Sequence, residues 1–201
     1  MPVAPPRPRR KQRRSPGLFP ILLVLVAGFL WLATGLASRE YFAAAAHKER
    51  YYFFWLLTLG ALMGVFLAAD LITLFVFFEM MSFTSYVWVA QNETPEALRA
   101  ANTYLAVAVI GGMTLLVGLF LLYDLLGTLE IGALAGLAAA LPEEKKVPLY
   151  VAGGCCLAGF GAKAGMFPLH IWLPKAHPVA PAPASALLSG ILTKSGVFGI
   201  L

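Results

Sequence analysis

The chain has 201 residues, of which 60% are hydrophobic and only 12% are charged, and its mean hydropathy is +0.79. In a soluble domain about a quarter of the residues are usually charged, so this composition excludes an ordinary water-soluble enzyme and indicates a membrane protein. The net charge of +5 is concentrated near the N-terminus, in Arg7, Arg9, Arg10, Lys11, Arg13 and Arg14.

Residues 1–17 form a basic tail rich in proline and arginine, which we expect to be disordered. A basic tail can bind nucleic acid, contact anionic lipid or anchor the next helix on the cytoplasmic side. Beside an apolar helix the last two interpretations are favoured, so no nucleic-acid partner is expected. An artefact of the assigned start of the reading frame is the alternative interpretation.

Six apolar segments follow, each close to the roughly 20 residues that a helix needs to cross the apolar core of a bilayer. Unpaired backbone groups are too costly in lipid for other geometries, so we expect an all-α membrane protein. Thr94 and Pro95 fit the N-cap and first position of one helix. Residues 18–201 are predicted to form one transmembrane domain, with spans at 18–37, 51–69, 70–90, 96–123, 147–167 with a broken continuation over 168–180, and 181–201.

No motif for a cofactor or a metal is present in these segments. Cys155 and Cys156 are adjacent, a geometry that rarely allows an unstrained disulfide, and they lack metal-ligand spacing, so we interpret them as packing residues. The pattern Gly159-x-Gly161-x-x-Ala164 resembles a dinucleotide fingerprint but follows no strand, so we take it as chance. We therefore expect no cofactor, no metal and no redox centre in this chain.

Three ionisable residues lie well inside predicted spans: Glu79, Lys163 and Lys194. Each costs about 2.5–3.5 kcal/mol at the centre of a membrane helix, and such residues usually face protein or water and line an ion or proton path. The alternatives are a purely structural ion pair for Glu79 and snorkelling of the lysines toward an interface.

A helix break is predicted just after Lys163. Pro168 has no N–H and clashes with the carbonyl of Ala164. Irregular backbone at membrane depth is tolerated only against protein or water. Gly161 and Gly165 flank the lysine as a small-xxx-small pair, which favours close approach of another helix.

His170 and His177 lie on the broken section. Either imidazole could relay protons near neutral pH. A hydrogen-bonded structural role is an equal alternative for both.

The stretch GFGAKAGMFPLHIWLPKAHPVAPAPASALLSGILTKSGVFGIL resembles the signature of the antiporter-like proton-translocating membrane subunits, and FVFFEMMSFTSY resembles their glutamate helix. This family comprises complex I membrane subunits, membrane subunits of energy-converting hydrogenases and formate hydrogenlyases, and subunits of multisubunit cation/proton antiporters. The resemblance covers residues 37–201. Full members contain two inverted repeats, so it implies a truncated member that holds most of the first repeat.

The resemblance also implies roles for single residues. Glu79 matches the glutamate that pairs with and tunes a lysine, and Lys163 matches that lysine on a discontinuous helix. Lys194 matches the next lysine of a central polar axis, and His177 matches a loop histidine. The implied partners are the lipid bilayer and other membrane and peripheral subunits of a respiratory or hydrogenase complex.

Three functions stay open. The first is a proton-translocating subunit, or a fragment of one, of an NADH-quinone oxidoreductase-like or a hydrogenase/formate hydrogenlyase complex, driven by electron transfer elsewhere. The loop HPVAPAPASALLSG favours the hydrogenase branch, and the chain would belong to an enzyme only as such a subunit. The second is a sodium/proton antiporter subunit. The third is a non-functional truncated or structural piece whose buried charges only pair.

Overall fold

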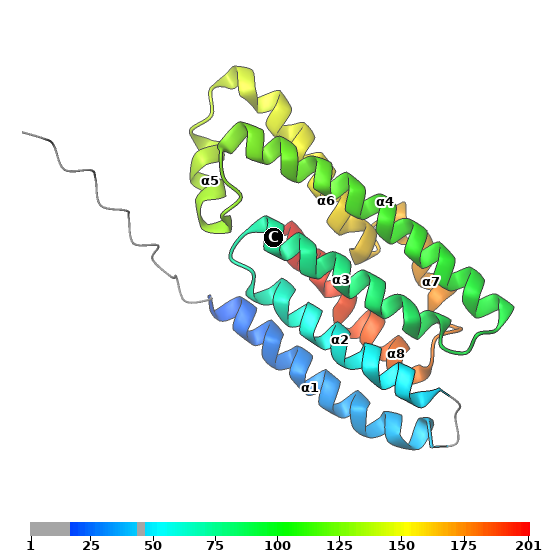
Figure 1. Ribbon diagram of the computed structural model, residues 1–201. Coiled ribbons are helices and arrows are strands. Elements are labelled where there is room, and N and C mark those ends of the chain that lie inside the picture. Colours follow the sequence, from blue (N-terminus) through cyan, green and yellow to red (C-terminus); the bar gives the residue numbers. More distant parts are fainter. Residues whose placement is uncertain (1–16, 44–46) are drawn as a thin grey trace, which may run out of the picture.

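The computed structural model describes residues 17–43 and 47–201, and this part of the chain is helical without a β-strand (Figure 1). Apart from Gly17, the predicted basic tail lies outside the described residues. The helices are α1 (Leu18–Tyr41), α2 (Lys48–Leu67), α3 (Leu71–Ala90), α4 (Pro95–Leu126), α5 (Ile131–Ala139), α6 (Lys146–Ala164), α7 (Leu173–Ala176), α8 (Ala182–Leu187) and α9 (Thr193–Ile200). Short 3-10 turns cover Glu143–Lys145 and Leu169–Trp172, and a π-helical segment, Leu188–Leu192, joins α8 to α9.

The predicted all-α membrane architecture is confirmed. Five helical stretches are long and apolar enough to cross a membrane: Leu18–Tyr41, Lys48–Leu67, Leu71–Ala90, Pro95–Leu126 and Glu143–Ala176. The last predicted segment is helical too, but it consists of α8, the π segment and α9 instead of one regular helix. The connection between α4 and α6 contains α5, a short helix that was not predicted from the sequence.

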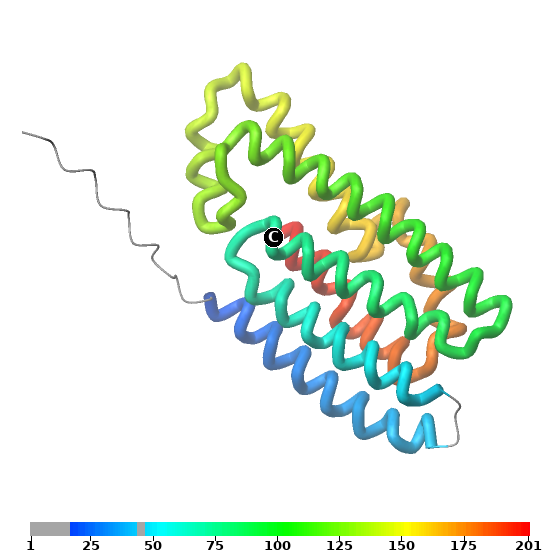
Figure 2. Tube along the Cα trace, in the orientation of Figure 1, coloured from blue at the N-terminus to red at the C-terminus, as the bar shows by residue number. Residues whose placement is uncertain are grey.

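The bundle brings three segments that are distant in sequence to one place. The helices α1, α2 and α3 lie side by side, α4 packs against both α3 and α6, and the α8–α9 segment passes behind α2 and α3 in the view of Figure 2. This segment contacts α1, α2 and α6. The outer face of α1 exposes apolar side chains such as Leu25, Phe29 and Leu32, as expected of a helix that faces lipid.

Two helix starts are set by side-chain caps. The carboxylate of Asp70 accepts hydrogen bonds from the backbone N–H of Thr73 (2.8 Å) and from its hydroxyl (2.8 Å), which starts α3. Thr94 accepts from the N–H of Ala97 (3.1 Å), with Pro95 at the first helical position, so the predicted cap of α4 is confirmed.

Helix α6 ends earlier than predicted from the sequence. Gly165 has a left-handed conformation (φ 77°), and its N–H donates to the carbonyl of Gly161, as does the N–H of Met166 (2.9 Å). This is a glycine C-cap, which stops a helix without help from a proline. The backbone therefore leaves the helix at Gly165, before Pro168 is reached.

Close packing of α4 and α6 depends on glycines other than the predicted pair. A Cβ at Gly159 would lie 2.5 Å from Cβ of Leu115 and 2.7 Å from the carbonyl oxygen of Gly111, both on α4. A Cβ at Gly161 would instead meet the side chain of Met166, in the turn that directly follows α6. Gly159, and not the Gly161 and Gly165 pair, therefore brings the two helices together.

We expect Gly159→Ala to destabilise the bundle by about 1–3 kcal/mol, because the new methyl group overpacks the α4–α6 contact. Thermal unfolding of the purified protein in detergent measures this loss. Gly154→Ala is the matched control on the same helix, since nothing lies within 4 Å of a Cβ there. Equal melting temperatures for the two variants would contradict the role assigned to Gly159.

Arg50 joins the start of α2 to the connection between α3 and α4. Its guanidinium donates to the carbonyl of Gln91 (3.0 Å) and forms an ion pair with Glu93. The hydrogen bond from Arg50 and its charge lower the pKa of the Glu93 carboxyl.

The Arg50–Glu93 pair should stabilise the fold in a pH-dependent way. Because the pKa of Glu93 is lowered in the folded state, the stabilisation is complete above the ordinary value of about 4.3 and is lost as the pH falls through the folded-state value. The melting-temperature difference between the wild type and Glu93→Gln should therefore shrink on acidification. A difference that stays constant down to about pH 3 would show that the pair does not act as described.

Candidate functional site

Lys163 is a buried cation in the last turn of α6, with only 3% of its surface exposed. The C-terminal end of a helix favours a positive charge, because the last carbonyls carry partial negative charge. That effect is too small to offset the loss of water around an ammonium, so direct partners are required.

Two hydroxyl groups on neighbouring helices supply these partners. The ammonium of Lys163 donates to the phenol oxygen of Tyr104 on α4 and to the hydroxyl of Ser82 on α3 (3.2 Å). The same nitrogen lies 4.7 Å from the centroid of the Tyr104 ring, within the range of a cation–π interaction. The lysine of α6 is thus held by α3 and α4 together.

Two series of hydrogen bonds start at Lys163, one through Ser82 and one through Tyr104 and Ser85, and each ends at a backbone carbonyl of α3. Ser82 donates to the carbonyl of Phe78 (3.0 Å), and Ser85 donates to the carbonyl of Met81 (2.6 Å). Because the Ser85 proton is used in that way, the phenol of Tyr104, 2.6 Å from Ser85 Oγ, donates to Ser85. These hydroxyls therefore anchor the lysine, and among the described residues no hydrogen bond leads from Ser82 or Ser85 to a further side chain.

Glu79 lies one helical turn before Ser82 on the same face of α3. Its Oε1 atom is buried and has no hydrogen-bond partner among the described residues. The carboxylate and the ammonium of Lys163 form no ion pair within 4.0 Å. An ammonium has three donors, and two of those of Lys163 are used among the described residues, so one N–H of the lysine and the Oε1 atom of Glu79 both lack a partner there.

Trp172 closes the site beside the helix break. Its indole N–H donates to the carbonyl of Ala162 (2.8 Å), and its ring lies 4.8 Å from that of Tyr104. The chain that leaves α6 at Gly165 is thereby fixed against the helix end that carries Lys163.

Lys194 is not part of this cluster in the described structure. It lies on an exposed face of α9 and donates to the backbone carbonyl of Ser189 in the π segment. Thr193 donates to the same oxygen (3.2 Å). The predicted role of Lys194 on a polar axis therefore stays a prediction, and no hydrogen bond of the described residues joins it to Lys163.

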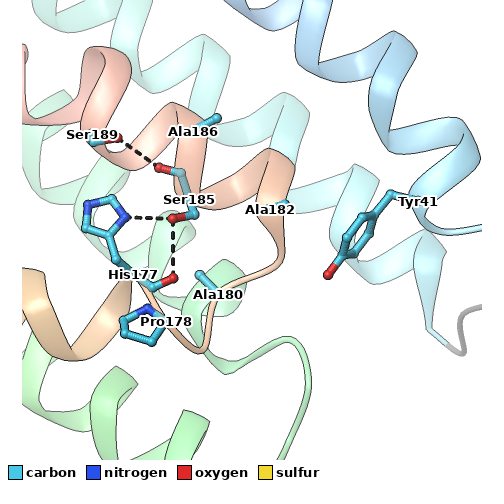
Figure 3. A pocket seen from close by; sticks show the side chains of 8 residues that line it. All are labelled: Tyr41, His177, Pro178, Ala180, Ala182, Ser185, Ala186 and Ser189. Carbon is cyan, nitrogen blue, oxygen red and sulfur yellow. Dashed lines mark hydrogen bonds between the residues drawn. The ribbon is translucent and has the colours of Figure 1, made fainter.

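His177 lies beside an open pocket of about 470 Å³ that also contacts Tyr41 of α1 (Figure 3). Its Nδ1 atom is 2.6 Å from the hydroxyl of Ser185, an arrangement consistent with the structural alternative. His177 follows the last of the five apolar spans, and burial lowers the pKa of its imidazole because the charged ring loses hydration.

His170 stacks on Phe167 with ring centroids 5.6 Å apart, and its buried Nδ1 has no partner among the described residues. Neither His170 nor His177 hydrogen-bonds to the lysine cluster, so the relay role of each stays a prediction. Within residues 17–43 and 47–201, no group of three or more His, Cys, Asp or Glu side chains could hold a metal ion.

Three members of the site were not predicted from the sequence: Tyr104, Ser82 and Ser85. A signal for the serines was present, because Glu79, Ser82 and Ser85 repeat every third residue and share one face of a helix. No comparable signal marks Tyr104, since tyrosine is common in membrane helices near either interface.

The chain is similar to known membrane subunits. The family model described as "NADH:quinone oxidoreductase/Mrp antiporter, TM" matches residues 68–201. The chain is 33% identical to a subunit of the Na(+)/H(+) antiporter of Alkalihalophilus pseudofirmus over 92% of its own length, and 33% identical to hydrogenase-4 component B of Escherichia coli over 89%. It spans 37% and 26%, respectively, of those two relatives.

A solved structure confirms the similarity of fold. The described chain matches a chain of an archaeal respiratory membrane complex, the membrane-bound sulfane sulfur reductase, with a TM-score of 0.83 and 27% identity. The match covers 94% of this chain and 40% of that one.

Tyr104→Phe should destabilise the protein by about 1.5–3 kcal/mol, because it removes a hydrogen bond to a buried charge. Tyr86→Phe is the matched control, since its hydroxyl makes only an exposed bond to Asn102 (3.2 Å), and it should cost less than about 0.5 kcal/mol. Thermal unfolding in detergent compares the two variants. A Tyr104 variant as stable as the control would show that the phenol does not hold the lysine.

Proposed function

The chain belongs to the NADH:quinone oxidoreductase/Mrp antiporter transmembrane family, and we propose that it forms a proton-conducting part of an ion-translocating membrane subunit in which Lys163 carries the transported proton. One observation carries this proposal: a buried ammonium is held by neutral hydroxyls of two neighbouring helices and forms no ion pair with the carboxylate that lies one helical turn from Ser82.

This arrangement suits a group that must gain and lose a proton. A lysine locked in direct contact with a carboxylate in an apolar interior is stabilised as an ion pair, and removing one charge leaves the other uncompensated. Hydroxyl partners accept from the ammonium and also remain suitable partners when the amine is neutral. Lys163 can therefore change its charge without losing its place.

Glu79 supplies the electrostatic control in this proposal. Its charge favours the protonated lysine, and burial of the site opposes it. A small change in the distance between the two groups, or in the water between them, changes the balance. Because the two groups form no direct ion pair, a water molecule that bridges them would give the proton a route between them.

The further path is proposed from the family resemblance. Lys194 and His177 would accept the proton beyond Lys163, with His170 as a possible relay near the break that contains Pro168. In the chain as described, Lys194 contacts Ser189 and not Lys163, so this step needs movement, water or groups from another polypeptide.

We place the chain in a multisubunit membrane complex, with cation/proton antiport as the leading function. The sequence motifs favoured the hydrogenase branch, and the relatives support antiport better, since the antiporter subunit from Alkalihalophilus pseudofirmus aligns over 92% of the chain. A hydrogenase-type complex is the second candidate, because hydrogenase-4 component B aligns almost as well. Neighbouring membrane subunits are part of both proposals.

Lys163→Ala should lower proton flux through the assembled complex in proteoliposomes by a factor on the order of 10², as expected when a proton-transfer group is removed. A pH-sensitive dye inside the vesicles reports the flux. Lys175→Ala is the matched control, because Lys175 is an exposed lysine of α7, and it should retain wild-type flux. Undiminished flux in the Lys163 variant would refute the proposal.

The same vesicles separate the two candidate complexes. A sodium or potassium gradient applied without an electron donor should drive proton flux if the complex is an antiporter. Flux that appears only when an electron donor and acceptor are supplied would favour the hydrogenase-type complex instead.

A further inference from the structure

The Glu79 carboxylate lies directly against the backbone of α4 at Gly112. A Cβ at residue 112 would come closest to Oε1 of Glu79, and it would lie 2.6 Å from Cδ and 2.8 Å from Oε2 of the same side chain. Real Cβ atoms do not approach other atoms so closely, so any larger residue would displace the carboxylate from this position. The bare Cα of Gly112 therefore forms a recess that the carboxylate occupies.

The preceding residue, Gly111, faces a different helix. A Cβ there would lie 2.8 Å from Cβ of Ala162, the residue before Lys163 on α6. Of two adjacent glycines of α4, Gly112 thus adjoins the carboxylate and Gly111 adjoins the residue before the lysine. Gly111 allows the lysine's helix to approach, and Gly112 makes room for the carboxylate.

We propose that Gly112 is a positioning residue that holds the Glu79 carboxylate apart from the Lys163 ammonium, an inference that rests on the function proposed above. Opposite charges in a low-dielectric interior attract one another strongly. The carboxylate nevertheless stays beyond ion-pair contact and leaves its Oε1 atom without a partner among the described residues. The recess at Gly112 accounts for this separation, because it is the place where the carboxylate fits.

Removing the recess should close the pair. In Gly112→Ala the methyl group displaces the carboxylate, which is the flexible end of a side chain and can move. One N–H of Lys163 has no partner among the described residues, so we expect the displaced carboxylate to contact the ammonium directly. A locked ion pair would then slow the transfer of the proton, and a displacement of this size can cost on the order of 10²-fold in rate.

Solid-state NMR on the assembled complex tests the geometry. The distance between ¹⁵Nζ of Lys163 and ¹³Cδ of Glu79 should be longer than an ion-pair contact in the wild type and should shorten to that contact in Gly112→Ala. An unchanged or longer distance in the variant would overturn the proposal. Gly118→Ala is the control on the same helix, since its Cβ would meet Sγ of Cys156 (2.8 Å) far from the carboxylate, and it should leave the distance unchanged.

A compensating variant guards against a general folding defect. Glu79→Asp shortens the side chain by one methylene group. In the double variant Gly112→Ala/Glu79→Asp the carboxylate should again have room, and its distance from Nζ of Lys163 should again exceed that of an ion pair. Failure of this double change to restore the separation would also count against the recess. If Gly112→Ala shortens the distance but proton flux stays at the wild-type level, the proton-carrying role of the Glu79 and Lys163 pair is overturned.

Discussion

Placing one nearly dehydrated ammonium inside an apolar bundle is the constraint on which the rest of this structure depends. Lys163 loses almost all contact with solvent, and an unpaired buried charge would cost more than a small membrane bundle can tolerate. Three helices meet the requirement together: α6 carries the lysine at its C-terminal end, α3 contributes serine hydroxyls, and α4 contributes the phenol of Tyr104. The packing of these helices and the chemistry of the site are consequences of the same need.

These hydrogen bonds to Lys163 are possible only because the helices pack closely. Gly159 lets α6 approach α4 until hydroxyl and ammonium can meet, and Gly165 ends α6 just after the lysine so that Trp172 can close over the site. At the same level of the bundle, Gly112 gives the Glu79 carboxylate a place of its own. Small residues thus fix distances here, and in the proposed function these distances decide whether the two opposite charges form a direct ion pair or remain separate.

The sequence predicted the class of fold and the charged residues Glu79 and Lys163. Both predictions follow from the free energy of placing polar groups and charges in an apolar environment, which depends directly on residue type. Long apolar runs require helices, and Glu79 and Lys163 are conspicuous as charges inside them. The sequence did not reveal Tyr104, Gly112 or the end of α6 at Gly165. Tyrosine and glycine have many roles in membrane helices, and only the register between helices shows which one faces a charge. Lys194 was also conspicuous as a charge in an apolar run; in the described chain it is exposed and contacts Ser189, and its role on a polar axis stays a prediction.

The central claim is that Lys163 changes its protonation state during transport and that Glu79 controls this change. The most direct measurement is the ¹⁵Nζ chemical shift of Lys163 in the assembled complex, followed across the pH range in which the complex moves protons, in the wild type and in Glu79→Gln. The account predicts a transition between ammonium and amine within that range and a displaced transition in the variant. A resonance that remains that of an ammonium throughout, unaffected by Glu79→Gln, would contradict the account.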